Sequence, residues 1–317
     1  MKAYLIDVNG TEHELPELLS WDVCHGLGEP CDYFEVSTLY TPELLQYLTA
    51  AVRFRAEHSG ETVFYGVVDE YLVTIDGRGS SVSVNGRSLA ALLMDNEVTK
   101  CTYYMMTKSS VRQNYLIPFG ITEVASGTMN DVLMFPVKSG DSAWSVLRRF
   151  CLKSARAIPG FTPSGQLRMT GLSGTTVTVN ADSGAERVRY KDERYGIISE
   201  ICVTNRATGG SYTLTNEDFC DRGGSRKRYV FTDKFDSVLS PGSDAGGHET
   251  GEDYIADSQR GKNCIELTVP TLFPCFPGDR VQLTSTALGV SGTYKVSSTH
   301  CWADSSGGGT VITLEVS

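Results

Sequence analysis

Residues 186–317 contain a series of short apolar runs, and this series constrains the fold more than any other feature of the chain. The runs are YGIISEICVTN, SYTLTNED, RKRYVFTDKF, CIELTVP, DRVQLTS, GTYKVSSTHCWA and TVITLEV. Breaks that contain glycine or proline separate most of them. Many short strands with turn signals between them are typical of antiparallel sheets. The pattern therefore predicts an antiparallel β-barrel or sandwich.

One segment interrupts this series. Residues 237–262, SVLSPGSDAGGHETGEDYIADSQRGK, are polar and poor in periodic apolar residues. A loop of this length is uncommon inside a compact domain, so we expect a long polar loop that is either mobile or ordered by a partner subunit.

The first region, residues 1–98, mixes strand and helix signals. It begins with the strand-like run YLIDV, and Thr41 followed by Pro42 predicts the start of a helix over TPELLQYLTAAVRF. Two apolar runs, VFYGVVDEYLVTI and SVSVNG, flank the turn sequence DGRGSS, which predicts a β-hairpin. Ser88 is placed to cap a short helix, LAALLMD.

The middle region, residues 99–185, contains the clearest helix signal, SGDSAWSVLRRFCLKSA, with Asp141 or Ser142 as the N-cap. Its apolar residues at helical spacing are Ala143, Val146, Leu147, Phe150 and Cys151. The runs GQLRMTG and TVTVN predict short strands packed around this helix.

The length of 317 residues favours two or three domains rather than one. We predict a mainly β chain with an α+β insertion. Residues 1–98 and 186–317 would each form an antiparallel β-barrel domain, and residues 99–185 would form a small peripheral α/β domain.

Charge and composition exclude several classes of protein. The formal net charge of −10 argues against a general affinity for the nucleic-acid backbone, which requires cationic groups. The sequence has no run of about 18 apolar residues that would insert into a membrane, and its first residues lack the apolar core of a signal peptide. We therefore expect a chain that folds in the cytosol.

The nine cysteines predict reduced thiols rather than a disulfide framework, because their number is odd and no CxxC pair occurs. Two sets of residues could be imagined as metal ligands. They are Cys24, His25 and Cys31, and Cys275, His300 and Cys301. Neither set has a second pair at ligand spacing, so we interpret them as loop residues, core thiols and a strand-end histidine, and we expect no metal site.

Motifs for catalysis are missing from the sequence. It contains neither the GxSxG pentapeptide of nucleophilic hydrolases nor the GxxxxGK[ST] phosphate loop. The acidic pairs Asp69-Glu70 and Glu252-Asp253 are best interpreted as solvated faces. The one dense basic cluster consists of Arg222, Arg226, Lys227 and Arg228, and it fits a solvated strand edge better than an acidic partner or a nucleic acid. We expect no catalytic residue and no bound cofactor.

The stretch from Val137 to Phe150, VKSGDSAWSVLRRF, resembles the opening of a LysM module, a family that binds peptidoglycan or chitin. The resemblance covers a strand, a GD turn and one helix, and the following residues do not resemble the second half of that module. A packing motif is the favoured interpretation. Cell-wall binding through residues 137–150, with Trp144 in the site, is the alternative.

Three segments resemble, in order and spacing, the baseplate hub family of contractile phage tails, which includes the late control D proteins of P2-like phages and the hub proteins of Mu-like phages and PBSX-like elements. They are Phe64–Asp95, GDSAWSVLRRFC with GQLRMT, and Phe276–Val316. In the first segment the family pattern falls on Gly66, Val68, Asp69, Gly86, Arg87, Leu93 and Asp95. In the third it falls on Pro277, Gly278, Asp279, Gly289, Gly292, Tyr294 and Val296.

This resemblance implies a structural baseplate hub subunit. Members form homotrimers in which each chain contributes two similar barrels of the tail-tube type, so that three chains present a pseudo-sixfold ring. The ring joins the hexameric tail tube to the trimeric spike, contacts tape-measure and wedge proteins, and leaves a channel through which DNA passes. The implied location is the baseplate of a virion or tail-like particle that is assembled in the bacterial cytoplasm. A wall hydrolase is the remaining alternative, because some hub proteins carry fused lytic domains.

Overall fold

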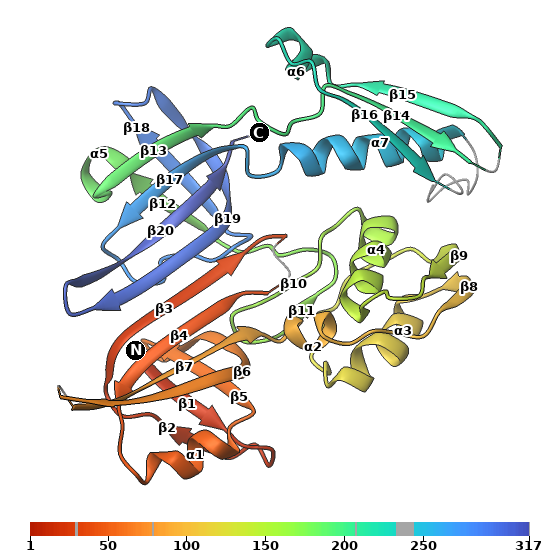
Figure 1. The fold of residues 1–317 in the computed structure, drawn as a ribbon. Coiled ribbons are helices and arrows are strands. Elements are labelled where there is room, and N and C mark those ends of the chain that lie inside the picture. The colour runs from red at the N-terminus through yellow and green to blue at the C-terminus, as the bar shows by residue number, and fades with distance from the viewer. Residues whose placement is uncertain (29–30, 78, 207, 233–243, 317) are drawn as a thin grey trace.

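The strands of both terminal regions join into one sheet. The computed structural model describes residues 1–317 apart from 29–30, 78, 207, 233–243 and 317. Within these described residues, thirteen strands form a single sheet in the order β13-β17-β20-β19-β3-β4-β7-β6-β5-β1-β2, with β18 and β12 branching from β19. Figure 1 shows two β modules, a helical domain beside the lower one and a separate arm at the top.

The N-terminal module is an antiparallel sheet around its own hydrophobic core. Its elements are β1 (Lys2–Ile6), β2 (Glu12–Glu14), β3 (Leu18–Gly26), β4 (Tyr33–Leu39), α1 (Leu44–Ala50), β5 (Arg53–His58), β6 (Glu61–Asp76) and β7 (Gly79–Ser88). Phe34, Phe54 and Phe64 fill its centre, and the rings of Phe34 and Phe54 stack with centroids 3.7 Å apart. These rings lie inside because successive side chains of a strand point to opposite faces.

The hairpin predicted around DGRGSS is confirmed, since β7 pairs with β6 from Gly66↔Ser88 to Asp76↔Gly79. The expected helix is shorter than predicted: α1 begins at Leu44, and its N-cap is Glu43, so Thr41 does not cap it. The end of the predicted helix is instead strand β5, which pairs with β1 and β6. Tertiary pairing has here replaced the local helical preference.

Two glycines of the hairpin allow β6 and β7 to approach closely. A Cβ atom on Gly66 would lie 2.1 Å from the carbonyl oxygen of Arg87, and one on Gly86 would lie 2.0 Å from that of Val67. The pairing shifts register between Val68 and Glu70, which marks a β-bulge at this point. Glycine is therefore required at both positions by backbone contact.

The C-terminal module is a second antiparallel sheet with a core of its own. Its elements are β12 (Thr176–Asn180), α5 (Ala181–Gly184), β13 (Arg187–Asp192), β17 (Asn263–Val269), β18 (Arg280–Ser285), β19 (Val290–Asp304) and β20 (Gly307–Glu315). Strand β12 pairs in parallel with β18, although it lies before residue 186 in the sequence. Leu267, Leu283 and Ile312 are fully buried in its core.

The two modules join edge to edge through β3 and β19, and we call this junction the module seam. Six residue pairs align antiparallel, from Ser298↔Gly26 to Ala303↔Trp21. The segment between β17 and β18 covers the inner side of the seam, where the ring of Phe273 stacks on Trp21 at 5.3 Å. The N-terminal core therefore includes side chains from both ends of the chain.

The expectation of barrels holds only in part. Among the pairings of the described strands, none joins β2 to β3 or β12 to β13, so each module is an open sheet, antiparallel apart from the parallel β12–β18 pair. At the seam, β3 already has β4 on one edge and β19 on the other. Because a strand has only two edges, that part of β3 is not free to close the N-terminal sheet onto β2.

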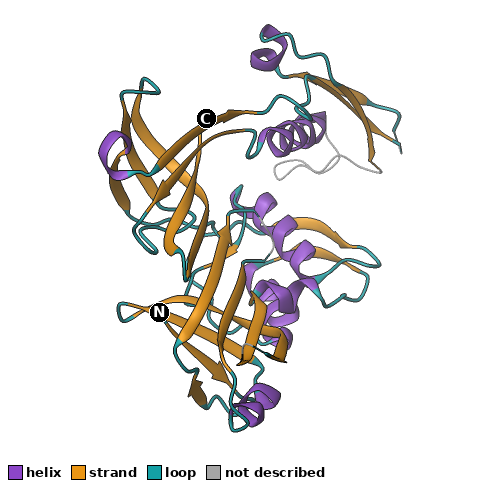
Figure 2. Ribbon diagram, turned by 60° about the vertical axis from the view of Figure 1, so that its left-hand side comes forward, coloured by secondary structure: helices purple, strands orange, loops and turns teal. Residues whose placement is uncertain are grey.

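The middle domain packs beside the N-terminal module (Figure 2). Its elements are α2 (Ala90–Met94), β8 (Cys101–Met106), α3 (Lys108–Val111), the π-helical turn η1 (Arg112–Leu116), the 3-10 turn η2 (Ile117–Phe119), β9 (Val132–Val137), α4 (Ala143–Ala155), β10 (Gly160–Phe161) and β11 (Leu167–Arg168). The predicted helix is confirmed as α4, with Ser142 as its N-cap. Ser88 does not cap α2, because its Oγ accepts a hydrogen bond from the Asp32 amide instead.

A separate arm is inserted between β13 and β17. It comprises β14 (Glu200–Asn205), β15 (Ser211–Thr215), α6 (Glu217–Asp221), β16 (Lys227–Thr232) and α7 (Asp244–Gln259). Helix α7 corrects the expectation of a polar loop over residues 237–262, of which 237–243 lie outside the described residues. Among its described residues, Gly247, Gly251 and Ile255 are buried, and a Cβ atom on Gly251 would touch Ile201 and Leu214 at 3.4 Å. The glycines let the helix lie close to the arm sheet.

Among the described helices, none combines the length and the hydropathy needed to span a membrane.

The close approach of β6 and β7 predicts that Gly86→Ala destabilises the protein. The added methyl group would meet the Val67 carbonyl oxygen and the Phe34 ring, at 2.0 Å and 2.8 Å, so the strands must separate. We expect the free energy of unfolding in urea to fall by about 3 kcal/mol, the upper end of the usual cost of overpacking. Gly77→Ala, which has nothing within 4 Å of the new atom, is the control. Equal stability of the two variants would contradict this interpretation.

Candidate functional site

The module seam brings together residues from the two ends of the chain, and its two faces differ. On the inner face of β3, Trp21, Val23 and His25 are buried. Nε2 of His25 lies 3.0 Å from the Val63 carbonyl oxygen, and Nδ1 lies 3.5 Å from Asp32. This histidine has partners on both ring nitrogens and belongs to the core.

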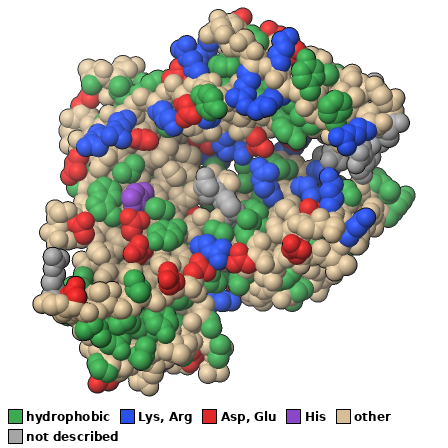
Figure 3. Space-filling model, in the orientation of Figure 1, with side chains coloured by type: hydrophobic (Ala, Val, Ile, Leu, Met, Phe, Trp, Pro, Cys, Tyr) green, Lys and Arg blue, Asp and Glu red, His purple; other side chains and the backbone are tan. Residues whose placement is uncertain are grey.

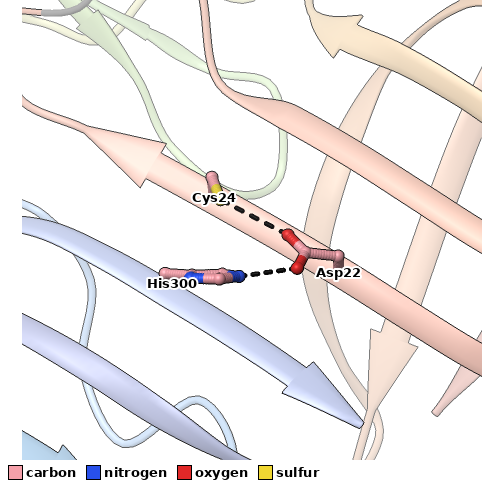
Figure 4. Close-up of side chains that lie close together, drawn as sticks. All are labelled: Asp22, Cys24 and His300. Atoms are coloured by element: carbon pink, nitrogen blue, oxygen red, sulfur yellow. Dashed lines mark hydrogen bonds and ion pairs between the residues drawn. The ribbon is translucent and has the colours of Figure 1, made fainter. Parts of the chain in front are cut away.

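The outer face of the seam carries a compact cluster of Asp22, Cys24 and His300 (Figure 4). Nε2 of His300 lies 2.6 Å from one carboxylate oxygen of Asp22, and the Cys24 thiol donates to the other oxygen at 3.4 Å. The hydrogen bond of His300 to Asp22, and after it the interaction of His300 with Cys24, raise the pKa of His300 to about 10. The cluster is the one group of potential metal ligands in the described part of the chain.

The fold separates the members of each of the two ligand sets that were considered from the sequence. Cys24 and His300, one from each set, come together at the seam with Asp22, which the sequence did not indicate. Cys31 packs against the middle-domain core, Cys275 is buried in the C-terminal core, and Cys301 is buried on the inner face of the seam. All nine cysteines are free thiols.

Arg87, in the first segment that resembles the hub family, links the hairpin to the middle domain. Its guanidinium forms a bidentate pair with Asp69 of β6 at 2.6 and 2.9 Å. It also binds both carboxylate oxygens of Asp95, at the end of α2, at 3.0 and 2.8 Å. The two carboxylates hold the pKa of Arg87 above its ordinary value, and Arg87 holds that of Asp95 below it. These residues therefore have a structural role.

Asp279, in the third segment, fixes the turn before β18. One of its oxygens accepts from the Thr175 amide at 2.7 Å, and the other accepts from the Phe276 amide at 2.8 Å. The preceding residue, Gly278, has φ +95° and lies against Leu172, where a side chain would collide. The PGD sequence thus connects the start of β18 to the chain that leads into β12.

The basic cluster does not form a single patch. Arg222 pairs with Asp192 at 2.6 Å, and Lys227 pairs with Glu200 at 3.0 Å. The guanidinium of Arg226 lies over the ring of Tyr195. Lys227 and Arg228 belong to β16, an edge strand of the arm sheet, where charged side chains discourage unwanted strand pairing.

The acidic pairs noted in the sequence also separate. Asp69 binds Arg87, whereas Glu70 accepts a hydrogen bond from Asn85 at 3.3 Å. In α7, Asp253 pairs with Arg156 of the middle domain at 3.4 Å. These carboxylates bind partners on neighbouring elements.

The helix of the LysM-like stretch packs its apolar face into the core of the middle domain. Trp144 is only 6% exposed and stacks on Phe161 with ring centroids 6.5 Å apart and planes inclined by 23°. Asp141, in the turn before α4, forms a bidentate pair with Arg149 at 2.7 and 2.9 Å. Because the tryptophan is buried, its ring is not presented for stacking on a sugar.

Several large apolar side chains are exposed at the far end of the N-terminal module. Leu39 is the last residue of β4, and Leu72 and Ile75 lie near the end of β6; they are 56%, 59% and 72% exposed. Figure 3 shows hydrophobic side chains concentrated over the lower module, with Lys and Arg side chains over the upper part of the molecule. An apolar surface of this kind is typical of a protein contact.

Neither a protein-family model nor a curated protein sequence matches this chain. Solved structures match it along almost its full length. The chain is similar to a tail protein from Neisseria meningitidis MC58 (TM-score 0.77, 16% identity, 98% of this chain and 95% of that chain covered). It is also similar to the 43 kDa tail protein of prophage MuSo2 from Shewanella oneidensis (TM-score 0.78, 17% identity, 99% and 98% covered).

A more distant match is the E. coli c3393 protein, which is a component of the type VI secretion system and is described as similar to the T4 bacteriophage tail proteins gp27 and gp5 (TM-score 0.54, 9% identity, 94% and 73% covered). The chain therefore has the fold of phage tail proteins, a fold that is also found in a type VI secretion component.

The position of Arg87 between two carboxylates predicts that Arg87→Gln destabilises the contact between hairpin and α2. We expect the free energy of unfolding to fall by about 1 kcal/mol, because the network is bidentate but a third exposed. Arg87→Lys keeps the charge and loses the planar fork, so it should restore only part of this stability in chemical denaturation. Wild-type stability of Arg87→Gln would show that the network contributes nothing.

The burial of Trp144 predicts that its replacement affects folding and not glycan binding. Trp144→Ala should lower the free energy of unfolding by about 3 to 5 kcal/mol, and the milder Trp144→Phe should retain a folded chain for pull-down with peptidoglycan. Trp302→Ala, on the outer face of β19, is the control for loss of an indole. Peptidoglycan capture by the wild type that Trp144→Phe abolishes at unchanged stability would favour the cell-wall alternative.

Proposed function

We propose that this chain is a structural hub subunit of a contractile tail baseplate, and that three copies form a ring that joins the tail tube to the spike. The observation that carries the proposal is the pairing of two antiparallel β modules within one chain, in a fold similar to phage tail proteins over 98% of its length. The role is mechanical, and we assign no catalytic residue or cofactor to it.

Two modules per chain offer a way to match different symmetries. A closed ring of three identical chains has threefold symmetry. If the two modules of each chain present similar surfaces, three chains present six such surfaces, which a hexameric tube can contact. A trimeric spike can then bind the opposite side of the same ring. The similarity to a type VI secretion component described as like gp27 and gp5 supports the spike as a partner.

The described strands also offer edges for contacts between copies. In the part of the sheet that is described, β2, β12 and β13 each have a single neighbour, so each has one edge without a strand. Such edges can extend a sheet across subunits through backbone hydrogen bonds. The apolar end formed by Leu39, Leu72 and Ile75 would gain stability by burial in such a contact.

The remaining partners follow from the position of a hub. We propose contacts with tape-measure and wedge proteins and a central channel through which DNA passes. A net charge of −10 suits this channel, since an acidic surface does not retain the phosphate backbone. The proposed location is the baseplate of a virion or tail-like particle, assembled in the bacterial cytoplasm.

The proposal predicts a homotrimer that depends on the apolar end of the N-terminal module. Light scattering and negative-stain imaging of the chain with its tube and spike proteins should reveal a ring with the mass of three chains. The double substitution Leu72→Asp and Ile75→Asp should abolish the ring without lowering the melting temperature, because both side chains are exposed.

Val8→Asp, in an exposed turn between β1 and β2, is the control. Compact monomers under every condition, with tube and spike present, would disprove the hub assignment.

A further inference from the structure

The cluster on the outer face of the module seam has a property that the proposed assembly does not use. Asp22, Cys24 and His300 supply one oxygen, one sulfur and one nitrogen donor, and these three atoms all lie within 4.8 Å of one another. The first two residues come from β3 and the third from β19, so the cluster spans the boundary between the modules (Figure 4).

The β ladder holds these donors in place. Asp22 and Cys24 are two residues apart on β3, so their side chains point to the same face of the sheet. His300 is the direct cross-strand partner of Cys24. Directly opposed residues have Cβ atoms about 5 Å apart, which places their side-chain ends in contact. The arrangement is therefore set by regular backbone pairing rather than by a loop.

The donor chemistry points to a specific class of ion. Thiolate, imidazole and carboxylate together are ligands that Zn²⁺ accepts in proteins, whereas Ca²⁺ and Mg²⁺ prefer oxygen donors alone. We propose that Asp22, Cys24 and His300 form a zinc-binding site that fastens β3 to β19.

The distances between the three donor atoms permit coordination of one zinc ion after small side-chain movements. Zn²⁺ bonds of about 2.0 to 2.3 Å in a tetrahedron place ligand atoms about 3.3 to 3.8 Å apart. Cys24 Sγ lies 3.4 Å from Asp22 Oδ1, whereas His300 Nε2 contacts the other carboxylate oxygen, Oδ2, so a small rotation of the carboxylate must bring one oxygen toward both donors. The 2.6 Å hydrogen bond between Asp22 and His300 must open by less than one ångström, with the ion taking the place of the shared proton. Binding would release protons from the ligands to the solvent, because metal ions bind the deprotonated side chains.

The site is accessible and keeps one position open. The side chains of His300 and Asp22 are 46% and 38% exposed, so an ion can enter from solvent. Three protein ligands leave the fourth tetrahedral position to water. An ion bound here would connect strands whose ligands are 278 positions apart in the sequence and would stabilise the folded state, because the unfolded chain does not hold them together.

Cobalt titration of the full-length reduced chain tests the proposal, because a thiolate bound to Co²⁺ gives a charge-transfer band and four-coordinate Co²⁺ gives intense visible bands. We expect a saturable spectrum with one ion per chain, displaced by Zn²⁺. Cys24→Ser should remove the charge-transfer band. His300→Gln and Asp22→Asn should each weaken binding by about 100-fold or more, since even loss of an outer-shell partner costs about 10- to 100-fold in affinity.

The controls are Cys101→Ser, which removes an exposed thiol outside the seam, and His13→Gln. Zinc should also raise the melting temperature of the wild type. Both controls should keep this rise and the wild-type cobalt spectrum. Cys24→Ser alters a single atom and should remain folded, but it should lose both. A charge-transfer band that survives in Cys24→Ser or disappears in Cys101→Ser would overturn the proposal. So would the lack of a saturable spectrum in the wild type. Neither outcome bears on trimer formation, so the hub proposal is tested separately.

Discussion

The backbone pairing between β3 and β19 is the interaction on which the rest of the structure depends. It is the step that turns two separate antiparallel sheets into one continuous sheet of thirteen described strands. Its register is strongly specified, because a shift by one residue would turn Trp21, Val23 and His25 out of the core. The same shift would carry Asp22 and Cys24 inside, where a carboxylate would lose water.

Strand β19 is shared by three partners, and this sharing fixes how the two modules are arranged. Its first half pairs with β18, its second half pairs with β3, and β20 lies along the other edge. The register against β20 shifts between Val296 and Ser298, at the point where the partner changes from β18 to β3. A bulge bends the strand that carries it. The direction of one module relative to the other is thus determined by a local feature of a single strand.

The sequence predicts the local elements well and the long-range ones poorly. Helix α4 and the β6–β7 hairpin follow from periodicity and turn residues, which are properties of neighbouring residues. The sequence pattern does not predict helix α7, because two of the three buried positions among its described side chains are glycines, which a hydropathy pattern does not register. The arm was assigned to a barrel because β14–β16 alternate like the strands of the C-terminal module.

Asp22 was not identified because its partner, His300, is 278 positions away, a separation that no local pattern spans. Tertiary pairing also determines the conformation of the residues after Ala50. Strand β5 forms there because it pairs with β1 on one edge and β6 on the other. Gly66, Gly86, Arg87 and Asp279 were noted from a resemblance alone. Their physical reasons, which are close backbone contact and charged hydrogen bonds between elements, become visible only in the folded chain.

The arm leaves and re-enters the C-terminal module at one point, since Asp192 and Asn263 form the last residue pair of β13 and β17. The Glu193 amide donates to the Lys262 carbonyl oxygen at 2.7 Å just beyond this pair, which closes the base of the insertion like the end of an ordinary hairpin. A two-residue turn could span the same position without disturbing the strands beneath it. The arm is therefore free to diverge or be exchanged for an unrelated domain during evolution, while the sheet that carries it stays unchanged.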